Sequence, residues 1–198
     1  MAFQIKGHGW EMLVKRLGLQ HGSRHQVRTY GTYQVYIDGV ETDLSGHICE
    51  CTGPGNNTRM GKTEHLRIRE GRYAVSTQYG LRYRSVGYTR DETHPPAFLL
   101  LGTGVRTAIL VHPGHPPKLY LSSIGCFNPT KPLRAGEKMV FTESRARVVA
   151  MLNSLKQHDP AAFARNKIGD NTMIEDAFVV VDGEPMKEVR EEEEVEVA

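Results

Sequence analysis

A two-residue alternation over residues 29–38 determines the class of fold expected for this chain. Apolar side chains recur at every second position of this segment, and it ends in Asp38-Gly39, which is typical of a tight hairpin turn. A return strand is then expected over 42–51. Because successive side chains of a strand point to opposite faces of the sheet, one face of this hairpin can be buried while the other faces water. The pattern predicts an antiparallel sheet.

Further short segments indicate the same fold class. Three runs are apolar and lie next to glycine or proline, as buried strands do: 98–101, 108–111 and 178–181. Alternation also predicts strands over 66–69, 73–77 and 80–85. Short strands separated by turn residues are typical of a mainly β domain, either a β-sandwich or a barrel-like sheet.

Two stretches have helical spacing instead. Residues 9–19 place apolar side chains three and four positions apart and stop at a glycine, which predicts a helix near the N-terminus. A second, C-terminal helix is expected near 143–165, limited or kinked by Pro160. The expected organisation is therefore a helical extension at 1–28, a single mostly β domain at 29–186 and an acidic mobile tail at 187–198.

Charge and hydropathy exclude several classes of protein. The 198 residues carry 25 basic and 23 acidic side chains, so the net charge of +2 does not favour nucleic acid or a membrane surface as a partner. There is no apolar stretch long enough for a signal peptide or a spanning helix. We expect a protein made in the cytoplasm, which acts in the periplasm or outside the cell only if cell lysis or a secretion machine delivers it.

A histidine and a cysteine on neighbouring short elements suggest thiol chemistry. His112 follows the apolar run at 108–111, and Cys126 follows Gly125 in a short turn. An imidazole near a thiol favours the thiolate and can later protonate a leaving group, and N–H groups of a tight turn can bind an oxyanion. With Cys49 and Cys51, the cysteine count is three, which suits one functional thiol better than a disulfide framework.

The segments around this pair resemble those of a known family. Val111-His112-Pro113-Gly114 and Ser123-Ile124-Gly125-Cys126 are similar to the His-Gly and Ser-x-Gly-Cys segments of YkuD-type L,D-transpeptidases. The resemblance implies a small, mostly β catalytic domain that acts on peptidoglycan stem peptides, by transpeptidation or as a carboxypeptidase. It implies Cys126 as the nucleophile, His112 as the base, Ser123 as a turn residue and Gly125 as the site of close backbone approach.

The sequence departs from that family at three points. Pro113 separates His112 from the glycine, the interval of fourteen positions from His112 to Cys126 is short, and Phe127-Asn128 replaces an aliphatic residue and an arginine. A weaker resemblance, over roughly 30–130, is to a small uncharacterised domain of phage-encoded and secretion-associated bacterial proteins. It rests on the glycine and tyrosine pattern at 31–39, on 68–73 and on the His112 and Cys126 segments, and implies phage or secretion-apparatus proteins as partners.

Four more residues are candidates for substrate binding. In a strand over 80–85, Arg82 and Arg84 would share one face, where guanidinium groups could bind the carboxylates of a stem peptide. The alternative is an ordinary solvated face over a core. His115, between prolines, and Asn128, just after the cysteine, are expected at the rim of the site.

Two alternatives accompany this interpretation. His112 and His115 with Cys126, or His47 with Cys49 and Cys51, are zinc-type ligands, but neither set has a spacing typical of zinc sites, so no metal and no cofactor is expected. The second alternative is a non-catalytic structural or interaction module of a phage particle or secretion apparatus. In that case Cys126 is a buried thiol and the two turns only close the β core.

Overall fold

A computed structural model describes residues 4–23, 25–59, 65–86, 94–164 and 171–184. In these ranges the chain forms eight strands and two helices. They are β1 (Trp10–His21), β2 (Val27–Ile37), β3 (Val40–Glu50), β4 (Gly71–Thr77), β5 (Phe98–Leu100), β6 (Leu110–Val111), β7 (Asn128–Thr130), α1 (Phe141–His158), α2 (Pro160–Ala164) and β8 (Met173–Asp182). Neither helix is both long and apolar enough to cross a membrane.

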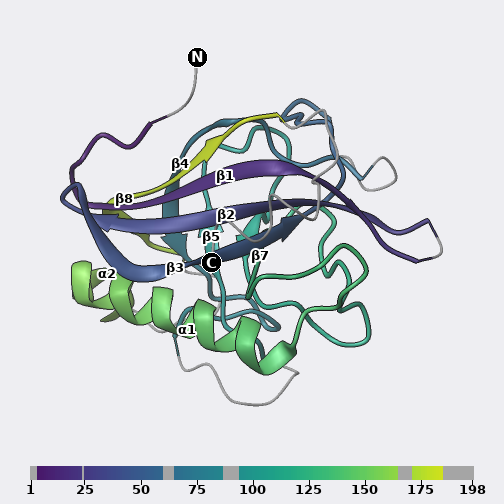
Figure 1. The fold of residues 1–198 in the computed structure, drawn as a ribbon. Helices are drawn as coiled ribbons and strands as arrows, with labels where there is room; N and C mark the ends of the chain where they lie inside the picture. Colours follow the sequence, from purple (N-terminus) through teal and green to yellow (C-terminus); the bar gives the residue numbers. More distant parts are fainter. Residues whose placement is uncertain (1–3, 24, 60–64, 87–93, 165–170, 185–198) are drawn as a thin grey trace.

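The eight strands form one sheet that nearly closes into a barrel (Figure 1). The strand order is β6-β5-β4-β8-β1-β2-β3-β7, and every neighbouring pair is antiparallel except β1 with β8. The two edge strands approach each other through a parallel bridge between Val111 and Phe127. The prediction of a mainly β fold is confirmed, but the described strands form a single curved sheet instead of the two packed sheets of a sandwich.

The predicted hairpin turn and the strands predicted from the three apolar runs are confirmed. Asp38 and Gly39 have φ of 48° and 80°, so the predicted hairpin turn uses two residues with positive φ, as a turn that follows the sheet twist requires. The three apolar runs become β5, β6 and β8. Over 66–69 and 80–85 the strand prediction is wrong, because these segments make only isolated bridges, such as Tyr79 with Arg84.

The predicted N-terminal helix is wrong, because residues 10–21 form the central strand β1. Its even-numbered residues from Trp10 to Gln20 are all buried, whereas of the odd-numbered residues only Glu11 is, so burial follows a two-residue period. Two of these inner positions, Arg16 and Gln20, are polar, and they hide the alternation from a hydrophobicity pattern. Because β1 pairs with both β2 and β8, residues 10–21 belong to the same sheet and are no separate extension.

The helix expected near 143–165 is present as α1 and α2. The helical segment is interrupted at Asp159, and Pro160 begins α2. At the first position of a helix the N–H has no partner within the helix, so proline loses no hydrogen bond there. Since β8 follows, this helical pair is internal to the domain instead of C-terminal. The acidic tail expected at 187–198 lies outside the described residues.

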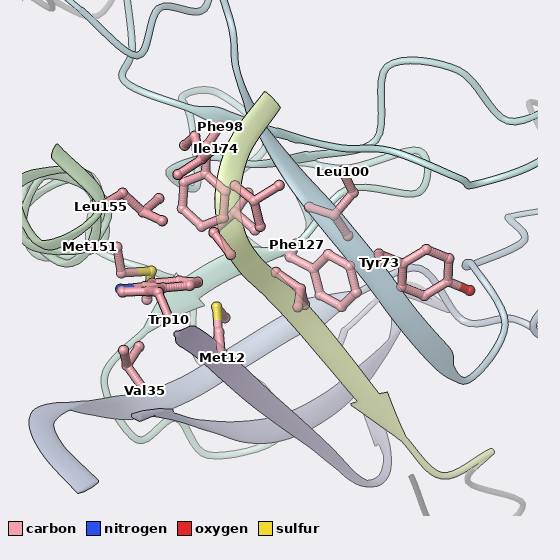
Figure 2. Packing of buried hydrophobic residues seen from close by; sticks show 14 of the residues in the cluster. Trp10, Met12, Val35, Tyr73, Phe98, Leu100, Phe127, Met151, Leu155 and Ile174 are labelled. Carbon is pink, nitrogen blue, oxygen red and sulfur yellow. The ribbon is translucent and has the colours of Figure 1, made fainter. Parts of the chain in front are cut away.

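The core lies between the sheet and α1, which runs beside β3 and β7 (Figure 1). Figure 2 shows Trp10 of β1 next to Met151 of α1, with Leu155 on the same side. Trp10 is fully buried, and its indole N–H donates to Ser154 Oγ at 3.0 Å, so its one polar atom is satisfied. This packing holds the helix against the barrel and fixes the end of β7.

Candidate active site

The candidate histidine and cysteine lie where the sheet closes. Around the Val111–Phe127 bridge, the Phe127 N–H donates to the Leu110 carbonyl at 2.8 Å and the His112 N–H donates to the Phe127 carbonyl at 3.0 Å. The segment ending in His112 therefore runs parallel to the segment starting at Cys126. The structure brings these residues onto adjacent segments, although within the described residues no hydrogen bond joins Cys126 Sγ to the imidazole.

The His112 ring is buried and held in one orientation. Its Nδ1 lies 2.8 Å from the Pro113 carbonyl oxygen, which can only accept, so Nδ1 carries the proton and Nε2 has the lone pair, with the Asn128 side-chain NH₂ 3.5 Å from it. The Tyr83 ring packs against it with 4.8 Å between centroids. Burial lowers the pKa of His112 to about 4, so the imidazole is neutral near pH 7 and its Nε2 can act as a base.

The Cys126 thiol is held by backbone groups on the neighbouring segment. Sγ accepts the Leu110 N–H at 3.4 Å and lies 3.6 Å from the Ala108 carbonyl, to which the S–H donates. Burial raises the pKa of Cys126 to about 11, against the effects of Leu110 and Arg106. A thiolate favoured by the histidine was expected from the sequence, whereas the structure has a neutral thiol and a neutral imidazole, because both groups are desolvated.

Ser123 and Gly125 shape the turn before the cysteine. Ser123 Oγ accepts the Gly125 N–H at 2.8 Å and donates to the Cys126 carbonyl at 2.7 Å. The Gly125 N–H is therefore occupied, while the N–H groups of Ile124 and Cys126 have no acceptor among the described residues. Gly125 has φ of 142°, and a Cβ there would lie 2.1 Å from Arg106 Nη2. Close approach does require this glycine, and the approaching group is the Arg106 side chain.

The two candidate arginines have different surroundings. Arg82 is exposed, and its guanidinium carbon lies 5.6 Å from the centroid of the Tyr83 ring, which in turn packs on His112. Arg84 is half-buried, and its backbone bridges to Tyr79 and Pro96. Since 80–85 is no strand, the two arginines do not form the shared strand face expected from the sequence.

His115 and Asn128 are anchored within the protein. His115 is half-buried, its Nδ1 lies 2.6 Å from the Pro116 carbonyl oxygen, and its ring contacts Phe141 at the start of α1 with 5.7 Å between centroids. Asn128 is fully buried: its side-chain NH₂ donates to the His112 carbonyl at 3.1 Å and its Oδ1 accepts the Ser122 N–H at 3.2 Å. Asn128 is thus placed to position His112, and its expected contact with substrate stays a prediction.

Sequence reasoning missed two residues of this site, Tyr83 and Arg106. Tyr83 lies between the two candidate arginines, Arg82 and Arg84, in the sequence. Arg106 lies twenty positions before Cys126 in a loop between β5 and β6, where a lone arginine beside glycines gives no signal of function. Only the closure of the sheet brings them to the histidine and the cysteine.

A cavity of about 630 Å³ lies elsewhere on the described surface, between Thr52-Gly53 and the segment 117–121. Its lining includes four basic or ionisable side chains, His25, His65, Lys118 and Lys138, and neither Cys126 nor His112. Among the described residues, no three His, Cys, Asp or Glu side chains are grouped to hold a metal ion.

No family model, curated protein or solved structure matches this chain. The function of this chain therefore has to be inferred from its own residues and their geometry.

Proposed function

We propose that this chain catalyses cysteine-dependent acyl transfer, with Cys126 as the nucleophile and His112 as the base. The supporting observation is the bond from His112 Nδ1–H to the Pro113 carbonyl, which leaves Nε2 basic on the segment adjacent to the cysteine. The free N–H groups of Ile124 and Cys126 are two donors of the kind that binds an oxyanion.

The proposed reaction has two steps. The Cys126 thiol gives its proton to His112 Nε2 as sulfur attacks a carbonyl carbon, and the tetrahedral oxyanion is held by the Ile124 and Cys126 N–H groups. On collapse, the carbon–nitrogen bond breaks and the imidazolium returns the proton to the leaving amine. An incoming amine or water then attacks the thioester, loses a proton to Nε2, and releases the thiol.

The raised thiol pKa and lowered imidazole pKa decide how the first step proceeds. Neither group is charged at rest, so proton transfer has to accompany the approach of a substrate that displaces the thiol from the Ala108 carbonyl. We therefore expect the Cys126 thiol to react slowly in the free protein and to become nucleophilic only when substrate is bound.

We propose peptidoglycan stem peptides as the substrate class, making the activity that of an L,D-transpeptidase or L,D-carboxypeptidase. The motif resemblance at His112 and Cys126 suggests this class. Arg82 supports it, because an exposed guanidinium beside the Tyr83–His112 pair can bind a stem carboxylate.

A second candidate function is a non-catalytic module of a phage particle or secretion apparatus. Two observations favour it: both hydrogen bonds of the Cys126 thiol go to backbone groups at the closure of the sheet, and the 630 Å³ cavity lies away from the thiol. In this view His112 and Cys126 only complete the barrel.

The deciding experiment incubates the protein with muropeptides that carry tetrapeptide stems and follows the products by mass spectrometry. Wild type and Cys49→Ala, which changes a fully buried cysteine outside the site, should release or exchange the terminal D-alanine. Cys126→Ala should leave the stems intact. If all three proteins leave the stems intact, acyl transfer is rejected in favour of the structural module.

A further inference from the structure

Among the described residues, the buried arginines form hydrogen bonds through at least two of their three side-chain nitrogens, with one exception. The described residues bury four of them: Arg16, Arg28, Arg67 and Arg106. Arg16 places Nε and Nη2 on the Glu50 carboxylate at 2.9 and 2.7 Å and Nη1 on Glu184 at 3.0 Å. Arg28 bonds through all three nitrogens, to Gln20 Oε1 and to backbone carbonyls. Such pairing is expected, because an unpaired buried charge is costly.

Arg106 is the exception. It is 3% exposed, and the one hydrogen bond of its side chain within the described residues runs from Nη2 to the Ile124 carbonyl at 3.1 Å. Its Nε and Nη1 have no partner among the described residues. Arg67 also has a lone Nε, but its other two nitrogens bond to Thr29 and to Glu184. Among the described residues, Arg106 is therefore the buried arginine with two side-chain nitrogens unbonded, and no carboxylate bonds to it.

The Arg106 guanidinium lies directly against the turn that carries the candidate nucleophile. The missing Cβ of Gly125 leaves the space that Nη2 fills, one residue before Cys126. The Glu50 carboxylate is close enough to affect the pKa of Arg106, but both of its oxygens are bound by Arg16. Within the part of the chain that the structure describes, no carboxylate forms a hydrogen bond or ion pair with Arg106.

The charged groups that most raise the pKa of Arg106 are thiolates. Ionised Cys51 and Cys126 would each raise the pKa of Arg106, and Arg106 is the charged side chain that lowers the pKa of Cys126. His112 is neutral, so it supplies no positive charge to the sulfur at rest. The cation for a thiolate at Cys126 is thus the arginine instead of the histidine.

We propose that Arg106 is the electrostatic partner of the Cys126 thiolate, and that its unpaired N–H groups stabilise the charge on sulfur when the thiol proton leaves for His112 Nε2. This inference deepens the proposed acyl transfer and rests on it only in requiring Cys126 to ionise. Arg106 acts through the nucleophile and need not touch substrate.

The test measures how the alkylation of Cys126 by iodoacetamide depends on pH, by mass spectrometry of the peptide that contains it. The variants are Arg106→Met, which removes the charge and keeps an unbranched side chain, and the control Arg69→Gln, which changes an exposed arginine outside the site. Arg106→Met should raise the apparent thiol pKa and slow alkylation at pH 8 by about tenfold, which corresponds to one pKa unit. Arg69→Gln should leave the profile unchanged.

Thermal unfolding of the same variants separates this role from a structural one. Because Arg106 has no anion at rest, Arg106→Met should fold and unfold at the wild-type temperature or above it. The proposal is overturned if Arg106→Met leaves the pH profile unchanged, or if it unfolds at a clearly lower temperature. Since no muropeptide is used, the inference can stand when acyl transfer fails, and it can fail when acyl transfer is observed.

Discussion

Val111 and Phe127 form the bridge through which the sheet closes, and the residues next to them are His112 and Cys126. Both bridge residues are fully buried in the core, whereas the cysteine beside Phe127 is partly exposed. The candidate site is therefore built where the two edges of the sheet meet. Its geometry depends on core packing directly beneath it.

Replacement of Phe127 by alanine should destabilise the protein strongly. The ring is fully buried in the core cluster, and loss of a buried phenylalanine typically costs about 3–5 kcal/mol of unfolding free energy. Denaturant unfolding of Phe127→Ala measures this cost. Ile124→Ala is the matched control, because Ile124 is 58% exposed in the same turn and should change stability by less than about 0.5 kcal/mol. Equal effects of the two variants would contradict the placement of Phe127.

Burial of neutral His112 should make stability fall in acid. The pKa of His112 is lowered to about 4 in the folded protein, below its ordinary value of 6.5. Its contribution is complete above pH 6.5 and is lost as the pH falls toward 4, because the unfolded chain then binds a proton that the folded chain does not. The free energy of unfolding should fall by roughly 3 kcal/mol over this window. His112→Asn should lack this part of the pH dependence in denaturant titrations at pH 7 and pH 4.5, and an unchanged slope would contradict it.

The buried pair of Arg16 and Glu50 should be sensitive to removal of one partner only. Both side chains are at most 1% exposed, and the carboxylate binds the guanidinium through both oxygens. Glu50→Gln leaves the buried Arg16 charge with Glu184 as its remaining carboxylate partner and should cost up to about 3–5 kcal/mol. The double variant Arg16→Met/Glu50→Leu should recover much of that loss. Urea unfolding of the three proteins checks this, and an additive double variant would refute the coupling.

The fold could be predicted where the signal is local in the chain. The hairpin at Asp38-Gly39 and the apolar strands need only a turn type and a short hydrophobic run. Strand β1 could not be predicted in this way, because the inner face of the barrel accepts Arg16 and Gln20 once Glu50 and Arg28 are present to bond them. Those partners lie on other strands, so nothing within residues 10–21 reveals the two-residue period.

The candidate site, too, could be predicted from the sequence only in part. The His112 and Cys126 segments could be predicted as neighbours because each follows or precedes a short core element. The protonation states could not, since they depend on burial that only the closed sheet produces. Arg106 and Tyr83 come from distant loops, and a single sequence holds no pattern that joins them to the thiol.

Arg82 and Asn128 should affect different steps of the proposed reaction. Exposed Arg82 is placed to bind a substrate carboxylate, so Arg82→Gln should raise KM and leave kcat nearly unchanged. Buried Asn128 holds the His112 carbonyl, so Asn128→Ala should lower kcat by roughly tenfold, as loss of a supporting hydrogen bond commonly does, with KM retained. Steady-state release of D-alanine from tetrapeptide stems measures both constants, with exposed Arg69→Gln as the control and circular dichroism as the check of folding. A rise in KM for a folded Asn128→Ala would instead place this amide in contact with substrate.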